Sequence, residues 1–123
     1  MTDRELLEMA AKAMGFVQHH SYREKTNSLL WLSESGFPAT WSPLTDDKDA
    51  FKCAVDLKMN LTLSGWRSEA QVADHPVVVE PVVNNDAYAA TRRAIVRAAA
   101  EIGRGAPALE RLNKAAEDNG EPL

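Results

Sequence analysis

The residues that could do chemistry lie most densely in the stretch WSPLTDDKDAF, residues 41–51. Its carboxylates are those of Asp46, Asp47 and Asp49. An EF-hand loop would need another oxygen ligand in place of Phe51 and a glycine in place of Lys52, so the template for calcium is not met. A catalytic pair of carboxylates would need two environments that separate their pKa values, which an exposed helix start does not supply. The stretch is instead typical of a helix N-terminus, with Thr45 as the cap and Asp46 and Asp47 in the first turn.

Histidine and cysteine are the other residue types that could bind metal or attack a substrate. They are His19, His20, Cys53 and His75. Structural zinc sites use close ligand pairs of recognised spacing, and adjacent histidines on a strand point to opposite faces. Cys53 is expected as a small apolar residue at the edge of a helix face, and a nucleophile pair would require it to meet a histidine in space. Motifs for hydrolysis, phosphate binding and dinucleotide binding are absent. We therefore expect no metal, no cofactor and no enzyme.

A basic helix face is the best candidate for contact with an anionic partner. Arg93, Arg97 and Arg104 fall on one side of a long predicted helix, with Arg92 near its edge. The alternative is a solvated face on which Arg97 pairs with Glu101 one turn later. Helical spacing alone leaves both interpretations open.

Trp41 is the second candidate for partner binding. It lies in a predicted loop next to Pro43, whereas Trp31 and Trp66 lie in or beside predicted strands and are expected in the core. Tryptophan is enriched in binding hot spots, so Trp41 either faces a partner or closes the edge of the core. The candidate partner-binding residues are therefore Trp41, Arg93, Arg97 and Arg104.

Composition bounds the class of protein. The chain has 123 residues, a formal net charge of -4 and a hydrophobic share of 45%, which is typical of one soluble globular domain. A net negative charge repels phosphate backbones, which disfavours nucleic acid as a partner. A single cysteine excludes an intrachain disulfide and favours the cytoplasm. No stretch approaches the ~20 apolar residues of a membrane span, and the N-terminus does not resemble a signal peptide.

Hydrophobic periodicity predicts the elements that position these residues, and it places Phe51 and Tyr88 on apolar helix faces and Leu61 and Leu63 at alternating positions of a half-buried strand. Helices are predicted over residues 3–14 and 46–59, from Asn85 or Asp86 to Gly103 and Gly105, and, as a short helix, over 107–118. A hairpin is predicted with strands near 16–17 and 29–32 and a turn at 19–28, and a loop follows over 35–45. A further strand is predicted over 60–66, and the β-branched run over 76–83 is predicted to be an edge strand because it contains Pro81. We predict one domain over residues 1–105, followed by a short C-terminal helix and a frayed tail over 106–123.

The order of these elements predicts the fold class. Helices and strands do not alternate as in a doubly wound parallel sheet, so a small, mainly antiparallel sheet of three or four strands is expected. Three amphipathic helices each need a hydrophobic partner, and one sheet offers two faces. The predicted fold is therefore α+β, a three-layer α/β/α sandwich around that sheet.

Three segments together resemble a known family. They are MTDRELLEMAAKAMG at the start, WSPLTDDKDAF in the middle and DAYAATRRAIVRAAAEIG near the end. In this order they resemble the phage ABA sandwich domain family, small phage and prophage proteins whose middle motif is W-N-P-L-x-D-D-x-D-A, with Ser42 here in place of the asparagine. The resemblance extends to about Gly105 and is weaker over residues 18–38 and in the C-terminal extension. It implies a layered α/β/α arrangement and a phage or prophage origin, and it carries over no catalytic or binding residue.

The sequence thus favours a phage-encoded accessory protein of the host bacterial cytoplasm that is not an enzyme and acts by binding a host or phage protein. The alternative is a module that binds nucleic acid or an anionic ligand through Arg93, Arg97 and Arg104. An enzyme that uses Cys53 or the histidines is the third hypothesis, and the oligomeric state is left open.

Overall fold

The helices and strands are seen in a computed structural model, which describes residues 2–16, 20–32 and 38–118. The helices are α1 (Asp3–Ala13), α2 (Asp47–Asp56) and α3 (Ala87–Asp118). The strands are β1 (His20–Arg23), β2 (Ser28–Leu32), β3 (Pro38–Trp41), β4 (Asn60–Leu63), β5 (Arg67–Gln71) and β6 (Val78–Pro81). They form two antiparallel sheets, sheet A in the order β1-β2-β3 and sheet B in the order β4-β5-β6. The class is therefore α+β, as predicted.

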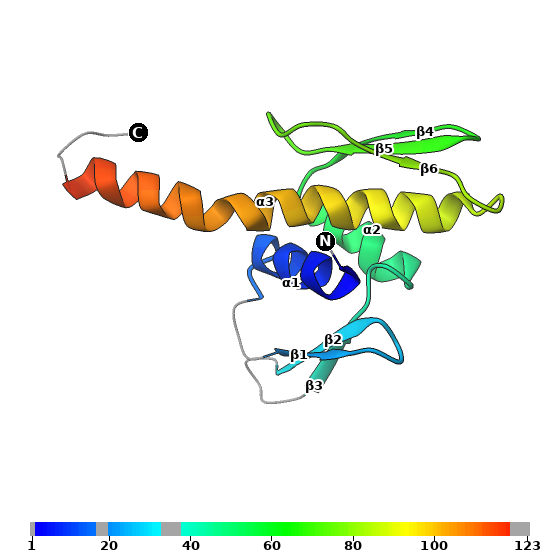
Figure 1. Ribbon diagram of the computed structural model, residues 1–123, viewed down its shortest axis with the longest axis horizontal. Coiled ribbons are helices and arrows are strands. Elements are labelled where there is room, and N and C mark those ends of the chain that lie inside the picture. The colour runs from blue at the N-terminus through cyan, green and yellow to red at the C-terminus, as the bar shows by residue number, and fades with distance from the viewer. Residues whose placement is uncertain (1, 17–19, 33–37, 119–123) are drawn as a thin grey trace.

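The helices lie between the two sheets (Figure 1). Sheet B packs on one side of α3, while α1 packs on α3 from another side and contacts sheet A through β2. The predicted three-layer sandwich around a single sheet is not confirmed, because the strands divide into two groups that α2 separates along the chain. Within each group short connections join neighbouring antiparallel strands, and such local pairing needs no strand from the other group.

Helix α1 starts and ends where the sequence predicts. Thr2 caps it in a complete capping box with Glu5, and Gly15 follows the helix with φ +81. The apolar face of α1 enters the larger of two core clusters, where its Leu7 and Ala10 are fully buried together with Val96 and Ala99 of α3. The smaller cluster lies under sheet B and also includes α3 residues, so α3 takes part in both cores.

Helix α3 does not end at Gly103 and Gly105, which corrects the predicted boundary. It runs for 32 residues, and the short helix predicted over 107–118 is its C-terminal part. Glycine costs only about 1 kcal/mol in a helix interior, which tertiary packing can offset. Here Gly103 is buried where α3 meets α1, and a Cβ at this position would lie 1.7 Å from the carbonyl oxygen of Met9. The tail over 119–123 lies outside the described residues.

Three strands differ from the prediction. β1 lies in the predicted turn over 19–28, Phe16 is not in a strand, and residue 17 lies outside the described residues. β3 lies in the predicted loop, because Pro38 is the first residue of an edge strand and its missing N–H interrupts no ladder. β5 carries little β propensity, but its Ser68 and Ala70 are buried against α3, so packing decides its structure. The predicted strand at 60–66 and the edge strand at Pro81 are confirmed as β4 and β6.

Candidate functional site

Each carboxylate of the acidic stretch has a structural partner. Asp46, not Thr45, is the N-cap of α2, and its Oδ1 accepts a hydrogen bond of 3.0 Å from the backbone N–H of Lys48. Asp47 forms an ion pair of 2.6 Å with Arg92 on α3. Asp49 accepts a hydrogen bond of 2.9 Å from the backbone N–H of Ser42 and so holds the preceding loop against the helix. The stretch therefore initiates α2 and anchors it to its surroundings.

Of the residues considered for nucleophilic or metal chemistry, Cys53 and His75 are the two whose side chains the structure describes. Cys53 is fully buried, and this burial, followed by the charge of Asp56, raises the pKa of its thiol from 9.0 to about 12. Such a thiol is not a thiolate near neutral pH. His19 and the side chain of His20 lie outside the described residues, and His75 belongs to a turn after β5. Among the residues described, no group of three or more His, Cys, Asp and Glu side chains could hold a metal ion.

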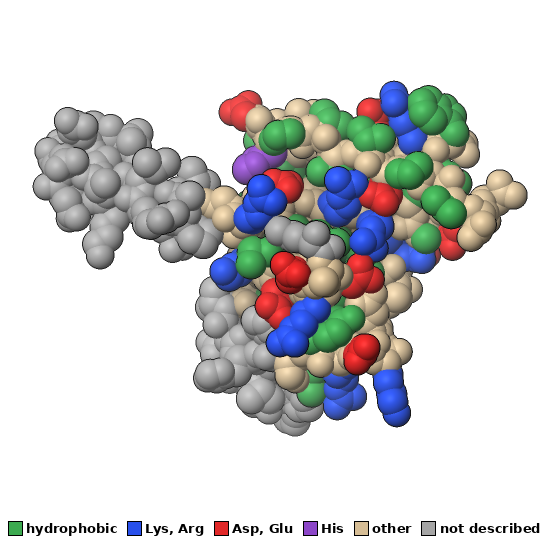
Figure 2. Space-filling model, in the orientation of Figure 1, with side chains coloured by type: hydrophobic (Ala, Val, Ile, Leu, Met, Phe, Trp, Pro, Cys, Tyr) green, Lys and Arg blue, Asp and Glu red, His purple; other side chains and the backbone are tan. Residues whose placement is uncertain are grey.

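The arginines of α3 mostly bind carboxylates of the same chain. Arg93 pairs with Asp3 at 3.0 Å and with Glu80 at 3.6 Å. Arg97 also pairs with Glu80 and donates to the carbonyl oxygen of Val79, so the proposed pairing of Arg97 with Glu101 is wrong. Figure 2 shows acidic and basic side chains side by side over this part of the surface.

Arg104 is the most exposed of these arginines, with its side chain 62% exposed and its carboxylate partner, Glu101, 3.8 Å away. The charges of Arg93 and Arg97 are already balanced by carboxylates that fasten sheet B and α1 to α3. Of Arg93, Arg97 and Arg104, Arg104 is therefore the one whose positive charge is least compensated by a neighbouring carboxylate.

Trp41 is buried, with 6% of its surface exposed, and its ring meets Phe16 edge-on at a centroid distance of 5.3 Å. Its assignment as a partner-binding residue loses its basis, because a buried ring offers little surface to a partner. Trp66, which was predicted to lie in the core, is instead 65% exposed in the turn between β4 and β5, and the side chain of Trp31 lies outside the described residues. The guanidinium of Arg67 lies 4.3 Å from the centre of the Trp66 ring.

An apolar groove opens beside β4, and the registry of sheet B explains why. Leu61 lies opposite Ala70, and Leu63 lies opposite Ser68. Opposite residues share a face of the sheet, so both leucines are on the face that packs on α3. Helix α3, however, packs against β5 and β6, and the inner face of β4 extends past it. Leu61 is consequently 38% exposed and Leu63 60% exposed, although both point toward the interior side of the sheet.

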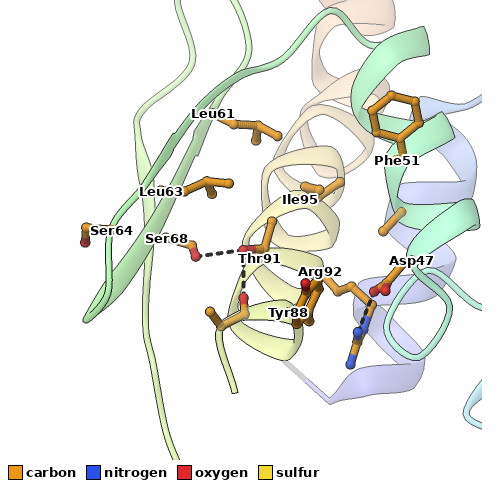
Figure 3. Close-up of a pocket in the computed structure, with 12 residues that line it drawn as sticks. Asp47, Phe51, Leu61, Leu63, Ser64, Ser68, Tyr88, Thr91, Arg92 and Ile95 are labelled. Atoms are coloured by element: carbon orange, nitrogen blue, oxygen red, sulfur yellow. Dashed lines mark hydrogen bonds and ion pairs between the residues drawn. The ribbon is translucent and has the colours of Figure 1, made fainter. Parts of the chain in front are cut away.

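The groove lies between β4, α2 and α3 and has a volume of about 580 Å³. Figure 3 shows Leu61 and Leu63 projecting from β4 on one side and Phe51 projecting from α2 on the other. Tyr88 and Ile95 of α3 line it as well. Phe51 is 70% exposed and Tyr88 72% exposed, which corrects the prediction that both lie on buried helix faces.

The charged groups of the groove and the hydroxyls of Ser68 and Thr91 have partners within the chain. Asp47 and Arg92 neutralise each other, and Arg92 also donates to the carbonyl oxygen of Leu44 at 2.9 Å. Thr91 donates to the carbonyl oxygen of Ala87, so the 2.9 Å bond between the Ser68 and Thr91 hydroxyls has Ser68 as its donor. The groove therefore carries no net charge and offers mainly aliphatic and aromatic surface.

This lining suits contact with a protein better than enclosure of a small molecule. Small-molecule sites bury most of the surface of their ligand, whereas the groove side chains with the largest apolar surface are themselves more than half exposed. The sequence contained the apolar residues but no sign that they stay uncovered, because periodicity places Phe51 and Tyr88 on apolar stripes like those of core residues.

Comparisons with models of known protein families, with curated proteins and with solved structures find no match. In the part of the chain that the structure describes, no helix is both long enough and apolar enough to cross a membrane.

Proposed function

We propose that this chain is a phage-encoded accessory protein that acts by binding a host or phage protein through the groove formed by β4, α2 and α3. The observation that carries the proposal is the set of large apolar side chains that the fold leaves exposed around one groove. These are Phe51, Leu61, Leu63 and Tyr88. Contiguous exposed apolar surface is characteristic of interaction sites, and aromatic anchors contribute much of the energy of such contacts.

The charge of the groove supports a protein partner over an anionic one. Its Asp47 carboxylate and Arg92 guanidinium balance each other, so the lining presents no excess positive charge to a phosphate. The alternative function, binding of nucleic acid or an anionic ligand by the arginine face, depends mainly on Arg104. A protein that shifts DNA and RNA at low salt, with the shift lost on Arg104→Ala, would favour that alternative.

The phage origin and the cytoplasm of the host as the place of action belong to the same proposal. Their support is the resemblance of three segments in one order and the single cysteine.

Site-specific photo-crosslinking in phage-infected or prophage-carrying cells tests the proposal. A photoreactive residue is placed at Leu61, which is 38% exposed in the groove, or at Val79, which is 41% exposed on the outer face of β6 and serves as the matched control. We expect a discrete crosslinked protein from position 61 that is lost when Phe51→Asp is added, and none from position 79. The same crosslinks from both positions, or none from position 61, would refute a partner at the groove.

A further inference from the structure

The edge of sheet B at β4 differs from the other strand edges of the described chain. The four edge strands are β1, β3, β4 and β6. Natural proteins protect such edges with charged residues or proline. β1 ends with Arg23, β3 begins with Pro38, and β6 contains Glu80 and Pro81. β4, with the sequence NLTL, contains neither charge nor proline.

Some main-chain N–H and C=O groups of β4 point away from sheet B and could pair with another strand. The backbone N–H of Ser64 donates to the carbonyl oxygen of Arg67 at 3.0 Å, so Ser64 faces β5. Along an antiparallel strand the main-chain groups point alternately to one neighbour and to the other. Thr62 and Asn60 therefore also face β5, while the N–H and C=O groups of Leu61 and Leu63 point away from it. The two residues whose side chains line the groove thus also present the pairing groups of the edge.

We propose that the occupant of this site is a second copy of the chain, which adds its own β4 antiparallel to β4 about a two-fold axis at Thr62. This inference rests on the proposed function and names the partner at the same groove. Leu61 of one copy lies opposite Leu63 of the other, and the two exchange their free main-chain hydrogen bonds. The sheet then continues from β6 of one copy to β6 of the other.

Charge and shape favour this occupant. The groove is neutral, so it accepts an uncharged strand with an apolar residue at every second position, and β4 is such a strand. A two-fold axis perpendicular to the sheet keeps the same face inward in both copies, so the leucines of each copy cover the groove of the other. On the outer face Thr62 lies opposite Thr62, a favourable cross-strand pair without like charges. The edge at β6 lacks this property, because it carries Glu80 and Pro81.

Two variants that introduce opposite charges at Thr62 test the two-fold pairing with the purified chain. Thr62 is exposed and lies opposite Glu69 on β5, so Thr62→Lys adds a favourable neighbour within one chain but places two lysines together at the axis. Thr62→Glu likewise brings two glutamates together. We expect the wild-type chain to have twice the 13.5 kDa mass of one chain by light scattering and sedimentation. We expect the dissociation constant of the dimer to rise roughly tenfold or more for each variant alone. A mixture of the two variants should form a dimer with one copy of each.

Val79→Lys is the matched control, because Val79 lies opposite Glu69 from the other side, on the outer face of β6. It should leave the mass unchanged. Hydrogen exchange supplies a second readout: the amides of Leu61 and Leu63 should exchange more slowly at high than at low protein concentration, whereas that of Thr62, already bonded to β5, should change little. Circular dichroism confirms that the variants are folded.

A wild-type mass of one chain at all concentrations overturns the inference, as does a dimer that Thr62→Lys and Thr62→Glu leave unchanged or whose Leu61 and Leu63 amides gain no protection. These failures differ from failure of the proposed function. A single-chain protein that still crosslinks to another protein from position 61 keeps the groove as a binding site and excludes the second copy as its occupant.

Discussion

Replacing Gly103 with alanine should destabilise the protein, although alanine is the better helix former. Gly103 is buried in α3 where α1 crosses it, and an alanine Cβ would lie 1.7 Å from the carbonyl oxygen of Met9 and 2.7 Å from its carbonyl carbon. Both contacts are with backbone, so no flexible side chain can move aside. The distance of 1.7 Å must rise to at least 3.0 Å, so the helices must separate by more than about 1 Å. A gap of about 1 Å already forfeits up to about half of the dispersion energy of each contact that it opens.

The expected magnitude combines two opposing effects. Overpacking of a core costs typically 1–3 kcal/mol, and a clash with backbone belongs at about 3 kcal/mol. Alanine in place of glycine in a helix interior returns about 1 kcal/mol. Gly103→Ala should therefore lower the free energy of unfolding by about 2 kcal/mol.

Gly105→Ala is the matched control in the same helix. Nothing lies within 4 Å of the Cβ that this change would add, so only the gain in helix propensity remains. It should raise the free energy of unfolding by about 0.5–1 kcal/mol. Urea unfolding followed by circular dichroism, at one fixed protein concentration because association adds stability, measures both variants. If Gly103→Ala stabilises the protein as much as Gly105→Ala does, the close approach of α1 and α3 at Gly103 is wrong.

Three further predictions concern groups that the structure assigns to new roles. Asp46→Ala should cost about 1 kcal/mol of unfolding free energy because it removes the cap of α2, whereas Thr45→Ala should cost clearly less; equal losses would restore Thr45 as the cap. Glu80→Gln should lower the free energy of unfolding by about 1 kcal/mol at low salt and by less at high salt, because Glu80 forms ion pairs with two arginines. Glu101→Gln should leave the free energy of unfolding nearly unchanged, and a larger loss for Glu101→Gln would contradict this ranking. Cys53 should resist thiol reagents in the folded protein and react on unfolding. Because its folded pKa is raised to about 12, its contribution to stability is complete below pH 9.0 and is lost as the pH rises from 9.0 toward 12; a Cys53→Ala variant with the same decline would refute this.

Local signals predicted the helix starts well. The capping box of Thr2 and Glu5 is formed within one turn, so its hydrogen bonds depend on neighbouring residues alone. The start of α2 was predicted to within one residue. The ion-pair partner of Asp47 was not predicted, because Arg92 lies far along the chain. The end of α3 was misplaced for the same kind of reason, since the role of Gly103 depends on Met9.

For the candidate site, the sequence predicted which apolar residues share a face but not that they are exposed. Phe51 and Tyr88 were placed on apolar helix faces, and Leu61 and Leu63 on one face of a strand, all from periodicity. None was expected to be exposed, and Trp41, which was expected as a candidate contact, is in the core. A tryptophan between prolines has the same sequence pattern whether or not another element covers it, and the same is true of an alternating strand.

The sequence by itself determined where α1 begins, to within one residue where α2 begins, which residues share a face, and that common catalytic motifs are absent. Tertiary structure alone decided that the strands divide into two sheets, that α3 lies between sheet B and α1, and that β4 extends beyond the helix that covers its neighbours. The physical reason is that periodicity specifies the apolar face of each element through local geometry, whereas the meeting of two faces depends on contacts between distant parts of the chain. The groove beside β4 exists because one such face has no partner in the described chain.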